Sequence, residues 1–275
     1  MLELPIIDWG TSPTLVYQFG TLTHGHPIVN GYSGYGSSLQ EWLGGDGSPL
    51  RDLSRLDRAL RALGAVGIRF VVIHQEDYDP PAAGQQMLTA LGEQGNQIAE
   101  RHDFGRVAAF RLKDVEPDLA AEPQETPAAT GLRPIGRERL RVTASQAPER
   151  VPALTDGNPD TRWLTGRPQD GSEWIRIDFD RPATVARLQI RMARRSYGDY
   201  PRDLQIDAIE PSGQVATLFA GDVILPFMRA VIADGAYPAI DLTLPPHEAV
   251  ALVIRQRGVT RTWFWSVHEL ALWER

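Results

Sequence analysis

The sequence ALTDGNPDTRW, at residues 153–163, decides how the second half of this chain is interpreted. Its central residues, from Asp156 to Pro159, are types that favour a tight turn. After this turn, apolar and polar residues alternate in three short runs, at 174–179, 187–192 and 204–207. A period of two places one face of each run in a core and the other in water. Gly, Pro and Asp separate the runs and no helical spacing is evident, so the pattern predicts an antiparallel β-sandwich over residues 138–275.

The first half of the chain alternates between helical and strand patterns. Ser48 is placed to cap a helix that Pro49 opens, leucines follow at helical spacing, and Gly64 ends the run. The next stretch, FVVI at residues 70–73, is apolar on both faces, which is typical of a buried central strand.

A second helix is predicted after Asp79, its expected N-cap, with an apolar stripe that reaches Ile98. Residues 107–112 then predict a closing strand. This alternation indicates a small α/β layer domain over residues 1–113. Residues 114–137 are polar and rich in proline, which predicts a linker between the two domains.

Composition excludes several classes of protein. The chain has 275 residues and a formal net charge of −7, which argues against a nucleic-acid partner. It contains no cysteine, so disulfides, thiolate metal sites and cysteine nucleophiles are excluded. No stretch is apolar enough to span a membrane, and the first residues lack the pattern of an export signal. Because the chain begins as a strand already under way, we expect it to be part of a longer protein.

Four stretches of the second half carry more than periodicity. They are the quoted turn at 153–163, EWIRIDF at 173–179, DYPR at 199–202 and WSVHEL at 265–270. In this order and spacing they resemble the discoidin, or coagulation factor V/VIII C-type, domain family, which includes many bacterial carbohydrate-binding modules. The resemblance covers about residues 138–275. It implies an eight-stranded jelly-roll sandwich whose two ends meet, with the turn after Leu154 beside Glu269.

The same resemblance implies a structural calcium ion at this junction. Calcium prefers six to eight hard oxygen ligands from a compact loop, and this loop is rich in oxygen donors. The candidate calcium ligands are Ala153, Asp156, Asn158, Thr161 and Glu269. The alternative is a turn that holds no metal, since Asp, Gly and Asn form tight turns unaided.

Ligands in this family are recognised by loops at one end of the sandwich. Loops are predicted here at 194–200, 224–229 and 257–263. An aromatic ring can stack on a sugar while Arg and Asp bond its hydroxyls. The candidate ligand-binding residues are Arg195, Tyr197, Asp199, Arg261 and Trp263. Burial is the alternative for Trp263, and we expect Trp163, Trp174 and Trp265 in the core.

The first half carries a resemblance of its own. LELP at residues 2–5, THGHPIVNGYSG at 23–34 and FVVIH at 70–74 occur in that order. They are similar to the soluble C-terminal region of bacterial polytopic membrane glycosyltransferase-like proteins, over about residues 1–113. The resemblance implies an extracytoplasmic or cell-surface location, with membrane attachment only through a segment upstream of this sequence.

Three residues are candidates for a binding crevice in the first domain: His24, Asn30 and His74. His74 ends a predicted strand, and α/β folds place ligands at strand C-termini. His24 and His26 would share one face of a strand and could form a metal pair. The alternative is that both imidazoles bond loop backbone beside the turn at Asn30.

These features predict a non-catalytic protein that binds a glycan through its second domain. Two alternatives stay open: an accessory domain of a membrane glycosyltransferase that uses a lipid-linked sugar donor, and a protein-interaction or adhesion module. A hydrolase is disfavoured because no motif brings two carboxylates together in a cleft. No phosphate loop, serine elbow or zinc motif is present. The identity of the glycan and the oligomeric state do not follow from the sequence.

Overall fold

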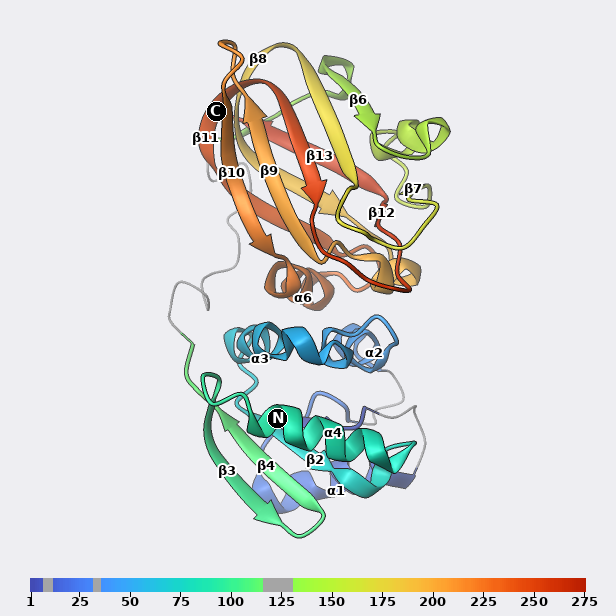
Figure 1. Cartoon of the computed structure of the whole chain (residues 1–275), viewed down its shortest axis with the longest axis vertical. Helices are drawn as coiled ribbons and strands as arrows, with labels where there is room; N and C mark the ends of the chain where they lie inside the picture. The colour runs from blue at the N-terminus through green and yellow to red at the C-terminus, as the bar shows by residue number, and fades with distance from the viewer. Residues whose placement is uncertain (7–11, 32–35, 116–130) are drawn as a thin grey trace. The chain divides into compact units, whose positions relative to one another are not determined.

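The computed structural model describes residues 1–6, 12–31, 36–115 and 131–275. The chain forms two compact units, Met1–Ala121 and Glu122–Arg275 (Figure 1). Most of the predicted linker at 114–137 lies outside the described residues. Its last residues belong to the C-terminal unit, because Arg133–Pro134 forms a strand there. No helix within the described ranges is long and apolar enough to cross a membrane.

The N-terminal unit contains one sheet, with β1 (Leu2–Leu4) beside β2 (Phe70–His74), then β4 (Val107–Leu112) and β3 (Ile98–Phe104). The pair β1 and β2 is parallel, with Leu4 opposite Ile73, and the other pairs are antiparallel. The prediction of an α/β layer domain is therefore confirmed in part, since this unit combines a mixed four-stranded sheet with helices. The expectation that 70–73 is buried on both faces is wrong, because Val71 and Ile73 are buried whereas Phe70 and Val72 are half-buried.

Helices and 3₁₀ turns connect these strands. They are α1 (Ser12–His24), α2 (Ser38–Gly44), η1 (Pro49–Arg51), η2 (Leu53–Arg55), α3 (Leu56–Ala65), η3 (Gln75–Asp77) and α4 (Pro81–Gly92). The Ser48 hydroxyl caps as expected by accepting from the Leu50 amide at 3.2 Å, but the element it opens is the short turn η1. The α-helix proper begins at Leu56 and buries one apolar face.

Three predictions for this unit need correction. Asp79 does not cap the second helix, because Pro80 holds the N-cap position and makes no side-chain cap. Ile98 belongs to β3 and not to the helix, which ends at Gly92. His24 is the last residue of a helix and not part of a strand, so it shares no strand face with His26. The helices α1 and α2 and the strand β3 were not predicted.

The C-terminal unit is built from antiparallel strands, as predicted. They are β5 (Arg133–Pro134), β6 (Leu140–Ala144), β7 (Trp163–Leu164), β8 (Trp174–Arg191), β9 (Asp203–Ile209), β10 (Val215–Asp222), β11 (Ala239–Gln256), β12 (Ser266–Val267) and β13 (Glu269–Glu274). The strand order is β10-β9-β11-β8-β13-β5 with β6 beside β8, and β12 pairs separately with β7. Three 3₁₀ turns join them: η4 (Arg137–Arg139), η5 (Pro148–Leu154) and η6 (Arg194–Asp199).

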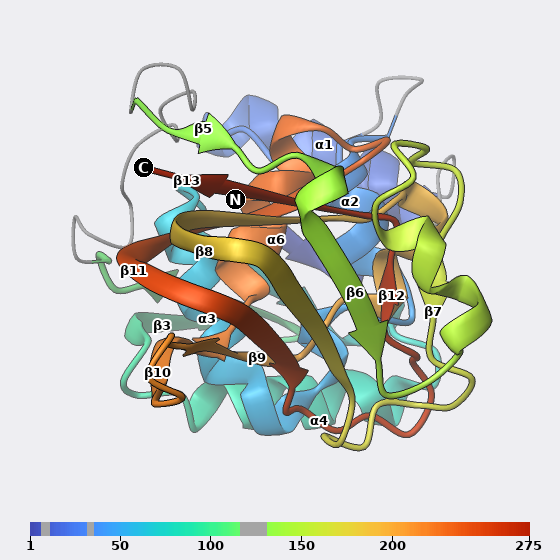
Figure 2. The same cartoon turned by 90° about the horizontal axis from the view of Figure 1, so that it is seen from above.

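Two strands of 18 residues, β8 and β11, hold this unit together. The first part of β8 pairs with β6 and with the end of β11, and its second part pairs with β13 and the start of β11. Figure 2 shows the two long strands running side by side and bending. Their bulged registers, near Ala183 and Ala249, let one pair of strands serve both ends of the sheet.

One helix, α6 (Ile224–Ala233), replaces the loop expected at 224–229. Its buried residues Ile224, Phe227, Met228 and Val231 recur at helical spacing and face the core. Pro226 lies in the first turn, where a missing backbone N–H is tolerated. The expectation of an all-β unit is therefore corrected: its described part, residues 131–275, contains the amphipathic helix α6 besides the strands.

The core of the C-terminal unit contains Trp163 and Trp265, each 0% exposed. Their rings meet edge to face, with centroids 5.1 Å apart. Both were expected in the core. Trp174, also expected there, is only half-buried because its side chain lies on the outer alternation of β8.

Candidate functional site

The turn after Leu154 lies beside the last strand, as the sequence predicted. A carboxylate oxygen of Glu269 accepts a hydrogen bond of 3.0 Å from the Gly157 amide. Within the turn, the Thr161 hydroxyl lies 2.7 Å from an Asp156 carboxylate oxygen and 2.9 Å from the Asn158 carbonyl oxygen. Gly157 has a φ of 78°, a left-handed conformation that glycine adopts without strain.

This junction gathers oxygen atoms and negative charge. Burial raises the pKa of Glu269 above its ordinary value, and the nearby Asp156 carboxylate raises it further. The oxygen atoms that could bind a metal belong to carboxylates, a hydroxyl and a carbonyl, and such ligands suit a hard cation such as calcium. Ala153, the remaining candidate ligand, lies in η5 just before the turn. Within the described ranges no three His, Asp or Glu side chains cluster closely enough to hold a metal, so the calcium ion stays a prediction.

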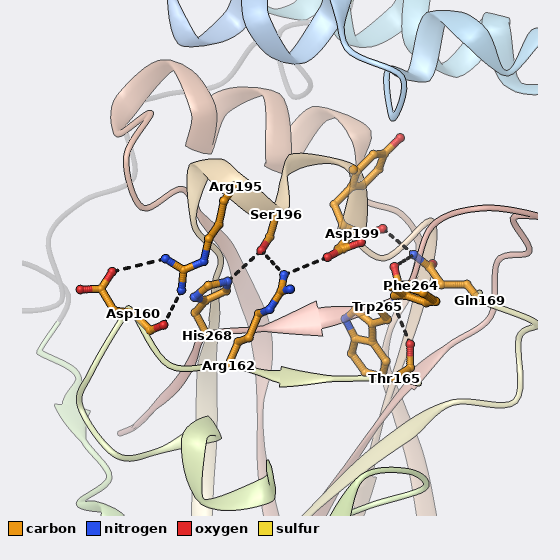
Figure 3. A network of polar contacts seen from close by, with 12 residues as sticks. Asp160, Arg162, Thr165, Gln169, Arg195, Ser196, Asp199, Phe264, Trp265 and His268 are labelled. Carbon is orange, nitrogen blue, oxygen red and sulfur yellow. Dashed lines mark hydrogen bonds and ion pairs between the residues drawn. The ribbon is translucent and has the colours of Figure 1, made fainter. Parts of the chain in front are cut away.

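Beside this turn lies a polar network that the sequence analysis did not assign (Figure 3). Nδ1 of His268 lies 2.7 Å from the Pro159 carbonyl oxygen, which can only accept, so this nitrogen carries the hydrogen. Burial holds the pKa of His268 below its ordinary value, so Nε2 is free to accept from the Ser196 hydroxyl at 3.0 Å. That hydroxyl accepts in turn from Arg162 at 2.8 Å.

Arg162 extends the network to Asp199. Its guanidinium lies 3.2 Å from an Asp199 carboxylate oxygen. Burial raises the pKa of Asp199, and the charge of Arg162 opposes that effect. Arg162 and His268 both lie within the motifs that suggested the family, but nothing in the sequence indicated that their side chains meet. The network fixes η6 against the turn at 156–161.

An exposed cluster lies at the edge of this network. Arg195 donates to the backbone carbonyl of Asp160 and lies 3.6 Å from its carboxylate. The Tyr237 hydroxyl, from the segment after α6, donates to the same carboxylate at 2.8 Å. Asp160 and Arg195 are exposed, so three segments far apart in sequence present polar groups to solvent. The sequence predicted Arg195 but missed Asp160 and Tyr237.

Two predicted ligand contacts are buried. Tyr197 is 7% exposed, packs edge to face against Phe227 and donates to the Gly235 carbonyl at 2.6 Å. Its ring cannot present a face to a sugar, so its prediction as a stacking platform is wrong. Asp199 is also 7% exposed and faces Arg162. Asp199 was predicted to contact the ligand directly, but it is buried and pairs with Arg162 inside the network.

The other two candidates lie on the loop at 257–263. Arg261 is exposed and Trp263 is half-buried. The Trp263 ring lies directly on Gly198, where an added Cβ would fall 2.3 Å from it. The Thr260 hydroxyl accepts from the Trp263 amide at 2.8 Å and fixes the loop. The loop therefore contacts η6 through Trp263 and Gly198. Trp263 is only half-buried and keeps some contact with solvent.

In the N-terminal unit the three crevice candidates do not all come together. The Asn30 side chain is buried and accepts from the Glu3 amide at 3.1 Å and donates to the Glu3 carbonyl at 2.8 Å. Nε2 of His74 lies 2.7 Å from the Glu3 carboxylate, and its ring stacks on Tyr17. His24 lies elsewhere, with its ring beside that of His26 and its Nδ1 accepting from the His26 amide.

Comparison with known proteins bears on the C-terminal unit. Residues 153–221 match the NedA-like, galactose-binding domain family. This stretch includes the turn at 156–161, the exposed Arg195 and the whole of η6. It lies within residues 138–275, for which the discoidin-type resemblance was stated, so that resemblance is supported for the C-terminal unit. No curated protein matches the chain. The resemblance of residues 1–113 to membrane glycosyltransferase-like proteins stays a prediction.

Solved structures with a similar arrangement include two carbohydrate-binding modules from Clostridium perfringens. The family 32 module of NanJ, in complex with galactose, is 18% identical with a TM-score of 0.41, covering 52% of this chain and 99% of its own. The third family 32 module of a family 31 glycoside hydrolase is 14% identical with a TM-score of 0.42, covering 55% of this chain and 100% of its own. At these identities and TM-scores each ligand is a property of that protein only.

Proposed function

We propose that the C-terminal unit is a non-catalytic carbohydrate-binding domain. The observation that carries this proposal is the match of residues 153–221 to a galactose-binding domain family. The matched stretch contains loops whose polar side chains reach solvent. A domain of this kind holds its ligand without a reaction, which agrees with the absence of a catalytic motif in the sequence.

The proposed sugar-contacting surface combines Asp160, Arg195 and Tyr237 with Arg261 and Trp263. Sugar hydroxyls both donate and accept hydrogen bonds, so a carboxylate and a guanidinium side by side can bind neighbouring hydroxyls. The half-buried Trp263 side chain offers an apolar contact to the C–H face of a pyranose. We infer that the buried network of His268, Ser196 and Arg162 positions these loops and does not touch the sugar.

We further propose that calcium at Ala153, Asp156, Asn158, Thr161 and Glu269 supports this surface. Asp160 lies in the same loop as the proposed ligands, two positions after Asn158. An ion that fixes this turn would therefore fix Asp160 as well. Its role would be structural, because it would hold the loop and the last strand together without entering a reaction.

A glycan array tests the proposal. The full chain, labelled and supplied with calcium, should bind one class of glycans, with galactose-terminated structures the first to inspect. Arg195→Ala should reduce that binding, whereas Thr217→Ala, on the distant strand β10, should not. No binding across plant, animal and bacterial glycans would refute carbohydrate recognition and favour the alternative of a protein-interaction module.

We also propose an extracytoplasmic setting for the chain, with the N-terminal unit as an accessory part of a membrane glycosyltransferase. The support is the resemblance of residues 1–113 alone. The reading frame upstream of Met1 tests it directly. Several hydrophobic segments in frame would support it, and an in-frame stop codon close to Met1 would exclude it.

A further inference from the structure

The N-terminal unit contains a pocket that the proposed carbohydrate site does not use. It opens where the parallel strands β1 and β2 both end, between Leu4 and the turn at 77–79. The volume is about 500 Å³, and such pockets typically hold small organic molecules. Parallel strands place ligands at this edge because the backbone turns away there and leaves a crevice.

The floor of the pocket is apolar. Leu4, Leu43, Leu50 and Met87 line it, and each is less than 10% exposed. One glycine of the lining lies in close contact with another lining residue: a Cβ on Gly44 would lie 2.8 Å from Ile6.

The charged groups that line the pocket include two carboxylates and one guanidinium. Asp77 and Asp79 line it together with one cation, Arg51. The Arg51 guanidinium already lies 3.3 Å from Asp46 and donates to the Gly44 carbonyl at 3.4 Å. Asp77 accepts from the Tyr17 hydroxyl at 2.6 Å, and no ion pair joins it to a cation of the described residues. Within the described ranges, a carboxylate that lines an apolar floor thus has no ion-pair partner.

We propose that this pocket binds a small organic cation with an apolar body, its ammonium group at Asp77 and its body on the floor formed by Leu43, Leu50 and Met87. The charge of Asp77 then gains a cationic partner, which the described residues do not supply. The apolar body displaces water from the pocket and contacts its apolar lining. This site lies within the N-terminal unit and is independent of carbohydrate binding by the C-terminal unit.

Three aromatic probes of similar size test the proposal: benzylamine, which is a cation at neutral pH, benzyl alcohol, which is neutral, and benzoate, which is an anion. Each is titrated into the ¹⁵N-labelled full chain, and backbone amide shifts are followed. Benzylamine should shift the amides of Leu43, Asp77 and Ala83, with weaker shifts from benzyl alcohol and none from benzoate. Equal or stronger binding of benzoate would overturn the proposal, as would shifts confined to other regions.

Variants separate charge from shape. Asp77→Asn keeps an acceptor for Tyr17 but removes the charge, and should weaken benzylamine about tenfold, as expected for a hydrogen bond to a charged group. Ala83→Leu fills the pocket from α4 and should abolish binding of all three probes. The matched control is Glu76→Gln, whose carboxylate in the same turn pairs with Arg106 outside the pocket. Unchanged benzylamine affinity in both Asp77→Asn and Ala83→Leu, each folded as judged by its amide spectrum, would overturn the assignment.

Discussion

Glu269 and Gly157 are joined by a hydrogen bond of 3.0 Å from backbone amide to carboxylate, although 112 positions separate them in the sequence. This contact joins the turn at 156–161 to the last strand, β13, of the C-terminal unit. It also brings the Asp156 carboxylate near Glu269, whose pKa is raised chiefly by burial and further by the negative charge of Asp156. A cation between them would relieve that repulsion, which gives the predicted calcium ion a physical reason.

Calcium should stabilise the C-terminal unit. An ion that binds only the folded state adds RT ln(1 + [L]/Kd), about 2.7 kcal/mol when calcium exceeds its Kd a hundredfold. Scanning calorimetry with millimolar calcium and then with EDTA should show a lower Tm after chelation. Glu269→Gln keeps an acceptor for Gly157 and should remove most of this difference. Superimposable melting curves of the wild-type chain would argue against the ion.

Carbohydrate affinity should depend on Arg195 and not on Tyr197. Loss of a charged hydrogen-bond donor costs about 1.5–3 kcal/mol, so Arg195→Ala should weaken binding of the best array glycan roughly tenfold or more. Tyr197→Phe removes a buried hydroxyl and should cost about 1 kcal/mol of stability while leaving affinity unchanged. Isothermal titration and urea denaturation measure the two quantities separately. The reverse ranking of affinities would mean that η6 presents a different face to the sugar.

The two core tryptophans should respond differently to the same substitution. Nε1 of Trp163 donates to the Gln146 carbonyl at 2.9 Å, whereas Nε1 of Trp265 has no partner among the described residues. Both changes to phenylalanine leave a cavity, but only Trp163→Phe also leaves a carbonyl unsatisfied. It should therefore be less stable than Trp265→Phe by about 1 kcal/mol in urea denaturation. Greater loss for Trp265→Phe would show that its Nε1 bonds a buried water.

Asp199 should give the C-terminal unit a defined pH dependence. Its pKa in the folded state is raised above the ordinary 3.8, chiefly by burial, so between these two values the folded state binds more proton than the unfolded state. The contribution of Asp199 to stability is therefore present below pH 3.8 and is lost as the pH rises through the folded-state pKa. As the pH rises through the folded-state pKa of Asp199, the free energy of unfolding of Asp199→Asn should increase relative to that of the wild type. Denaturation curves at several pH values measure it, and a pH-independent difference would contradict the burial argument.

Local patterns predicted much of the fold. The alternation at 174–179 and 187–192 identified both parts of β8, and residues 107–112 were correctly predicted as β4. The helix α6 was missed although Ile224, Phe227, Met228 and Val231 carry its spacing. The segment is short and Pro226 made it resemble a loop, but a proline in the first turn does not break a helix.

The candidate site was less predictable, because it depends on contacts between distant segments. Residue types suited to sugar contact suggested Tyr197 and Arg195 equally, yet one is buried and the other exposed. Composition cannot tell a ring that fills the core from one that faces a ligand. Asp160 and Tyr237 meet only because α6 places the segment after it over the turn at 156–161. No local spacing could have predicted that contact.

A crystal structure of the full chain soaked with the best glycan from the array would measure the position of the sugar directly. Density for the sugar is expected against Arg195, Asp160 and Trp263, without contact to His268. Sugar bound on another surface would contradict carbohydrate recognition through these loops. So would the lack of sugar density on the loops at a saturating glycan concentration.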